Sequence, residues 1–139
     1  MGKLLGIDFG EKLVGISLSD EEMKYSFAEE ALSYKTPDDL CEKINQIRRD
    51  ENVEKVIVGL PLNFKGDKTV QTLKVEKFSK DLKEKTNIPF EFQDERLTSK
   101  MSHSLFMEKR KKNKVSKHKI NAESARIILQ DYLDRKNLE

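Results

Sequence analysis

Two short acidic motifs contain the residues of this chain that could carry out chemistry. Residues 4–10 (LLGIDFG) and residues 90–96 (FEFQDER) are both apolar, strand-like runs that lead into a carboxylate, Asp8 and Glu95. Adjacent parallel strands that end this way would bring the two carboxylates together at one edge of a sheet, where they repel each other unless a cation lies between them. Because oxygen ligands suit magnesium or manganese, the motifs predict metal-assisted phosphate chemistry.

Composition limits what kind of protein this can be. The 139 residues are 37% charged and 36% hydrophobic, which fits one domain, residues 1–139, with its own core. A single cysteine, Cys41, excludes an internal disulfide and favours a reducing, cytoplasmic setting. No apolar run approaches the roughly 20 residues of a membrane span, so we expect no membrane contact.

Positive charge is concentrated in one segment. The whole chain has a net charge of +2, but residues 99–120 hold eight Lys or Arg and one acid, which gives this segment +7 and the remainder −5. Such a block predicts contact with a polyanion such as a nucleic-acid backbone. The candidate contacts are Lys109, Arg110, Lys111, Lys112 and Lys114. The alternative is a solvated, mobile lysine-rich loop.

The order of the expected elements indicates an α/β fold. Strands are expected at 3–7, 14–19, 31–35, 55–59 and 90–94. Helices are expected after Thr36, at 69–85, from Thr98 or Ser99 onward, and at 120–135. Strands that alternate with helices imply parallel crossovers, while the opening hairpin adds antiparallel strands. We therefore predict a mixed five-stranded sheet with helices on both faces.

Several longer motifs carry a resemblance to a known family. They are LLGIDFG, VGISLSD, VIVGLPLNFKGD, FQDERLTS and AESARIILQDYLD. Together, in this order and over essentially the whole chain, they resemble the YqgF/RuvX family, which has a three-layer ribonuclease H-like fold. The resemblance implies a metal-dependent endonuclease that processes the 5′ end of pre-16S ribosomal RNA. The alternatives are a Holliday junction resolvase in DNA recombination or repair, which would need a symmetric dimer, and a non-catalytic nucleic-acid-binding module.

The same resemblance assigns roles to individual residues. Asp8 and Glu95 match carboxylates that hold one or two Mg²⁺ or Mn²⁺ ions, and Gly10 matches a glycine that lets a phosphate come close. The family's third ligand is an aspartate at the start of the final helix, where this chain has Asn121. Asparagine offers a carbonyl oxygen but no charge, so the site would hold −2 rather than −3. Glu123, two residues further on, should point well away from Asn121 on a helix.

Three more polar residues lie beside these motifs. Arg96 could bind a phosphate through its planar guanidinium or form a salt bridge with Asp94. Asp94 should point to the side of the strand opposite Glu95. Asn63, in the loop after the strand at 55–59, is a candidate substrate contact, and its alternative role is in the turn itself.

Overall fold

A six-stranded mixed sheet forms the centre of the part of the chain that this computed structural model describes, residues 2–10, 13–95 and 117–138. The strands are β1 (Lys3–Phe9), β2 (Leu13–Ser19), β3 (Ser26–Ala28), β4 (Leu32–Ser33), β5 (Val53–Leu60) and β6 (Phe90–Asp94). Their order is β3-β2-β1-β5-β6, and β4 also pairs with β2. β1 runs antiparallel to β2 and parallel to β5, which runs parallel to β6.

The expected strand at 31–35 is wrong in its bounds, and the sheet has one strand more than the five predicted. Two short strands, β3 and β4, pair one after the other with the same edge of β2. They are separated by Glu29 and Glu30, which are exposed, and by the buried Ala31. The sequence pattern predicted only one strand in this region. Segments of two or three residues are too short to display an alternation of buried and exposed side chains.

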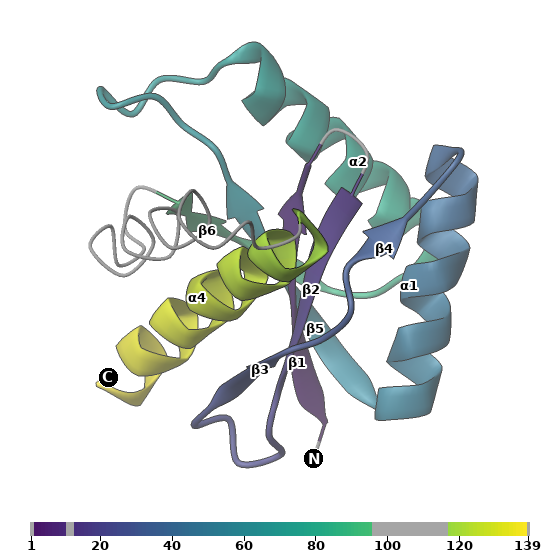
Figure 1. Cartoon of the computed structure of the whole chain (residues 1–139), viewed down its shortest axis with the longest axis vertical. Coiled ribbons are helices and arrows are strands. Elements are labelled where there is room, and N and C mark those ends of the chain that lie inside the picture. The colour runs from purple at the N-terminus through teal and green to yellow at the C-terminus, as the bar shows by residue number, and fades with distance from the viewer. Residues whose placement is uncertain (1, 11–12, 96–116, 139) are drawn as a thin grey trace.

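Three helices of the described residues cover the two faces of the sheet, which confirms the predicted α/β architecture (Figure 1). α1 (Pro37–Glu51) and α2 (Val70–Thr86) cover one face, and α4 (Lys117–Asn137) crosses the other. Leu40 and Ile44 of α1 and Leu82 of α2 are buried in the larger core, while Leu129 of α4 belongs to the second core. No helix among the described residues is long and apolar enough to cross a membrane.

Local sequence signals set the ends of these helices. Thr36 caps α1 by accepting a hydrogen bond from the Asp39 backbone N–H at 3.1 Å, and Thr69 caps α2 in a reciprocal pair with Thr72. Asn52 and Asn87 end α1 and α2 in the left-handed conformation. The final helix begins three residues earlier than expected, at Lys117. The helix expected from Thr98 or Ser99 lies outside the described residues.

α4 lies close to the sheet because the strands present small residues to it. A Cβ added to Gly6 would be 2.9 Å from the Leu129 Cβ, and one added to Gly15 would be 1.8 Å from the Asn121 carbonyl oxygen. The Ser17 hydroxyl donates a hydrogen bond to the Ala125 carbonyl oxygen at 2.8 Å. The backbone of α4 therefore packs directly against β1 and β2.

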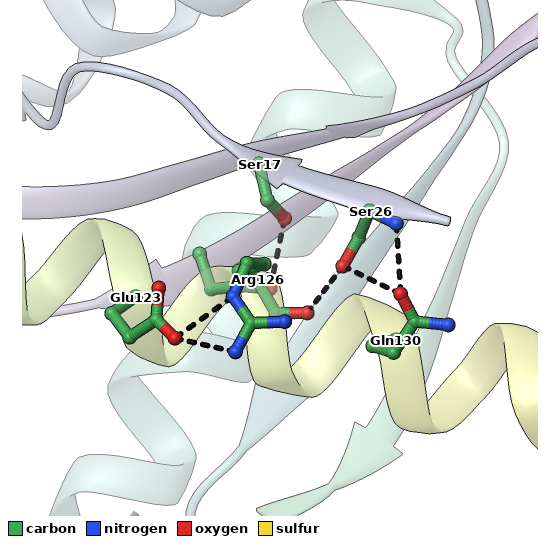
Figure 2. A network of polar contacts seen from close by, with 6 residues as sticks. Ser17, Ser26, Glu123, Arg126 and Gln130 are labelled. Carbon is green, nitrogen blue, oxygen red and sulfur yellow. Dashed lines mark hydrogen bonds and ion pairs between the residues drawn. The ribbon is translucent and has the colours of Figure 1, made fainter. Parts of the chain in front are cut away.

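A polar network fixes how α4 is rotated on the sheet (Figure 2). The Ser26 hydroxyl donates to the Arg126 carbonyl oxygen at 2.8 Å, and the Ser26 backbone N–H donates to Gln130 Oε1 at 2.9 Å. With the Ser17 bond, these contacts join β2 and β3 to two successive turns of the helix. Because they fix the helix axially and in rotation, they also determine where its first residues lie.

Candidate metal and nucleic-acid site

Strand alternation places the Asp8 side chain on the face covered by α4. Leu4 packs in the core beneath α4, and Gly6 lies against Leu129 of that helix. Phe9, the residue after Asp8, faces the other way and packs edge-to-face against Phe78 of α2, with ring centroids 4.6 Å apart. Since side chains alternate along a strand, Asp8 shares the face of Leu4 and Gly6.

Glu95 reaches Asp8 by crossing a glycine on the strand between them. β5 lies between β1 and β6, with Ile7 paired to Val58 and Gly59 paired to Gln93. A Cβ added to Gly59 would be 2.8 Å from Glu95 Oε1, so the missing side chain provides the space that Glu95 occupies. A side-chain hydrogen bond joins the Asp8 and Glu95 carboxyl groups. The carboxylates of the two acidic motifs therefore lie side by side.

The surroundings of Asp8 disfavour its negative charge. Burial raises the pKa of Asp8 well above its usual value, and both repulsion from Glu95 and the hydrogen bond between them raise it further. Residue 8 as a whole is partly exposed, but its carboxyl group is largely withdrawn from water. A divalent cation between the two groups would offset this repulsion, so the pair fits a magnesium or manganese ion.

Asn121, at the start of α4, lies near the strands that carry Asp8. Gly15 is the direct partner of Asp8 on β2, and the Asn121 carbonyl carbon would lie 2.5 Å from a Cβ added there. The Asn121 amide nitrogen is 3.7 Å from the position of a Gly10 Cβ. The start of α4, with Asn121, therefore lies beside the end of the β1–β2 pair that carries Asp8. Within the described residues, no group of three or more His, Cys, Asp or Glu could hold a metal ion.

Glu123 does not take the place of a third carboxylate. Its Oε1 accepts a hydrogen bond from Arg126 Nε at 2.8 Å and also pairs with the terminal nitrogen of the same guanidinium (Figure 2). The Glu123 carboxylate is therefore paired with Arg126 of the next turn of α4 and not with Asp8.

The other predicted residues divide into three groups. Asn63 Oδ1 accepts hydrogen bonds from the backbone N–H groups of Lys65 at 3.0 Å and Asp67 at 2.8 Å, so it closes the loop after β5. The Gly10 N–H donates to the Leu13 carbonyl oxygen at 2.8 Å, and a Cβ would lie 2.6 Å from that oxygen, so the turn itself requires glycine. The predicted contacts Arg96, Lys109, Arg110, Lys111, Lys112 and Lys114 lie outside the described residues.

Sequence reasoning missed the two glycines that build the site. Gly15 and Gly59 flank Asp8 on the neighbouring strands and leave room for Asn121 and Glu95. A glycine inside a strand pattern is a recognised sign that another backbone or a ligand comes close. That signal was present in VGISLSD and VIVGL.

Gly15→Ala should destabilise the protein and displace the start of α4. The new methyl group would overlap the Asn121 carbonyl oxygen, so we expect a loss of about 1–3 kcal/mol in the free energy of unfolding. Urea unfolding measures the loss. Ser33→Ala, at an exposed position of β4, is the control and should change stability by less than about 0.5 kcal/mol. Equal unfolding curves for wild type and Gly15→Ala would contradict this close packing.

The raised pKa of Asp8 predicts how stability depends on pH in chelator. Because the folded state keeps the Asp8 proton to higher pH than the unfolded state does, stability falls as pH rises from about 4 through the raised pKa. Asp8→Asn removes this loss, which is about 1.4 kcal/mol for each unit of pKa difference. In urea unfolding experiments in EDTA from pH 4 to pH 8, the free energy of unfolding of the variant should increase relative to that of wild type as pH rises. If the free energies of unfolding of wild type and variant instead change with pH in parallel, the pKa of Asp8 is not raised in the folded state.

Comparison with known proteins gives a consistent family and fold. Residues 2–135 match the model of a family described as "RuvX: Holliday junction resolvase". A protein of Dictyoglomus thermophilum is 32% identical over 140 residues, covering 99% of each chain, and one of Sulfurihydrogenibium sp. is 36% identical over 137 residues, covering 97% of this chain and 92% of its own. Both are named "Putative pre-16S rRNA nuclease".

RuvC of T. thermophilus, solved in complex with a Holliday junction substrate, superimposes with a TM-score of 0.64 at 11% identity, over 98% of this chain and 97% of that one. At that identity the likeness concerns the fold alone.

Proposed function

The chain belongs to the RuvX family, and from that membership together with its paired carboxylates we propose that it is a divalent-metal-dependent endonuclease that processes the 5′ end of pre-16S ribosomal RNA. The observation that carries the proposal is the contact between Asp8 and Glu95, where burial and then repulsion from Glu95 raise the pKa of Asp8. The two acids are held together where β1 and β6 end, with the Asp8 carboxyl group largely withdrawn from water, and a phosphodiester could approach there.

The residues of the site have separate tasks. Asp8 and Glu95 would hold Mg²⁺ or Mn²⁺ through their carboxylate oxygens, and Asn121 through its amide oxygen. When bound, the metal supplies activation of water and stabilisation of the leaving oxygen. Gly10 keeps side-chain atoms away from this edge of the site, so that a phosphate can lie close to the backbone. With two charges instead of three, the site should bind its ion more weakly than an all-carboxylate site.

The chain would act as one domain in the cytoplasm on a ribosomal RNA precursor. Support comes from the relatives named as pre-16S rRNA nucleases, which match nearly the full length of the chain, and from the single cysteine, which is unpaired and buried. The second candidate is Holliday junction resolution, which the description of the family names. Both activities would use the same metal ligands and differ in substrate and in the need for a symmetric dimer.

A cleavage assay separates these candidates. Wild type is incubated with Mg²⁺ or Mn²⁺ and either precursor 16S RNA, a four-way DNA junction or single strands. Cleavage of the RNA precursor alone supports the proposal, and symmetric nicking of the junction supports the second candidate. If all substrates bind but none is cleaved with any ion, the chain is a non-catalytic binding module.

The lysine-rich segment should contribute binding that does not depend on sequence. Changing Lys111, Lys112 and Lys114 to glutamine removes three positive charges from a segment with seven basic residues at positions 109–119. Because bound phosphates release counterions, we expect weaker binding to all RNA sequences alike and a salt dependence that is shallower by up to about three units of slope. Fluorescence anisotropy at several salt concentrations measures both. An unchanged slope would mean that these lysines are only solvated.

A further inference from the structure

A pocket of about 450 Å³ lies at the end of β1, on the side of the sheet that α2 covers. Its lining residues are Phe9, Gly10, Tyr34, Gln71, Lys74, Val75 and Phe78. Gly10 connects this pocket to the carboxylate site, because the Asn121 amide nitrogen approaches the same glycine within 3.7 Å of its Cβ position. Gly10 therefore lines the pocket and also lies next to the Asn121 amide, two residues after Asp8.

Aromatic side chains form much of the pocket wall. Phe9 and Phe78 meet edge-to-face at 66°, and Tyr34 packs beside the same core. All three are only partly buried, although each contributes to the core. Part of each ring therefore remains accessible, which is the kind of surface on which an unpaired base stacks.

Polar groups that could bind a base edge or a phosphate line the same pocket. The Tyr34 hydroxyl, the Gln71 amide and the Lys74 ammonium form no hydrogen bond or ion pair with other described residues. An amide offers both a donor and an acceptor to the edge of a base, and an ammonium group binds a phosphate. None of the seven lining residues is acidic, so the pocket does not repel an anionic strand.

We propose that this pocket receives one unpaired nucleotide of the substrate, next to the phosphate held at Asp8 and Glu95. The inference rests on the proposed nuclease function and specifies its substrate. The strand would cross the end of β1 at Gly10, which itself carries no side chain, and turn a base toward Phe9 and Tyr34. A base held in a duplex cannot enter, so cleavage requires a single-stranded or splayed nucleotide beside the scissile bond.

Binding measured without cleavage tests the pocket directly. Lys74→Gln and Tyr34→Leu are compared with wild type for a labelled 12-nucleotide single-stranded RNA, and for the same RNA annealed to its complement, by anisotropy in EDTA. We expect each variant to bind the single strand about tenfold more weakly, because one stacked base or phosphate contact is lost, and the duplex equally well. Lys80→Gln is the matched control, since Lys80 is an exposed lysine of the same helix outside the pocket.

The outcomes separate this inference from the nuclease proposal. If Lys74→Gln and Tyr34→Leu bind and cleave like Lys80→Gln while wild type cleaves RNA, the pocket inference is overturned and the nuclease stands. If wild type cleaves nothing but both variants lose single-strand binding, the nuclease proposal fails and the nucleotide pocket stands. Wild-type affinity for AMP or UMP equal to that for the oligonucleotide would also overturn the inference, because the pocket would then bind free nucleotides. Should Tyr34→Leu fail to fold, the exposed Lys74→Gln still decides the question.

Discussion

Asp8→Asn should lower the rate of phosphodiester cleavage by at least about a hundredfold while the protein remains folded. The amide is nearly the same size as the carboxylate, so packing on the α4 face is kept. It is neutral and a weaker ligand for a divalent ion, and it removes one of only two negative charges that the cluster with Asn121 contains. Single-turnover cleavage at saturating Mg²⁺, with circular dichroism to check the fold, measures the effect.

Asp94→Asn is the matched control for this loss of activity. Asp94 is an acid at the end of β6, one residue before Glu95, and pairs with Leu60 of β5. By strand alternation its side chain lies on the face opposite Glu95. The control should keep more than about a third of wild-type activity, since its carboxylate would not contact the ion. Full activity of Asp8→Asn would remove the basis of the metal site.

Asn121→Asp should bind Mg²⁺ about tenfold more tightly than wild type. The substitution places a third negative charge beside Gly10, where the Asn121 amide already lies. Without metal, the added carboxylate repels Asp8 and Glu95, so the variant should be less stable than wild type in EDTA. In excess Mg²⁺ the tighter binding stabilises the folded state by up to about 1.4 kcal/mol more than in wild type. Thermal melting with and without metal measures both effects.

Asn137→Asp is the control for the metal response. It makes the same substitution at the exposed far end of the same helix, so its metal-dependent shift in melting temperature should equal that of wild type. Cleavage rates measured in parallel would show whether the missing charge limits activity. Identical shifts in Asn121→Asp and wild type would place residue 121 outside the metal site.

Local sequence determined most of the element boundaries. Thr36 and Thr69 cap their helices because their side chains can accept bonds from backbone N–H groups three residues on, and Asn87 ends α2 because asparagine tolerates the left-handed conformation. These interactions span a few residues and need no partner from elsewhere in the chain. The two short strands β3 and β4 depend instead on the edge of β2, whose paired residues lie between 7 and 20 positions earlier in the sequence.

Hydrophobic alternation and the order of elements are local properties, so they were enough to predict that Asp8 and Glu95 lie at the ends of two parallel strands. The expectation that these strands are adjacent was wrong, because β5 lies between them, and the distance is spanned only because residue 59 is a glycine. The position of Asn121 was likewise decided in three dimensions, where Gly15, Ser17 and Ser26 hold α4 against the sheet. The pocket beside Gly10 joins residues of β1 and α2 with Tyr34, and such a surface exists only after those distant segments pack together.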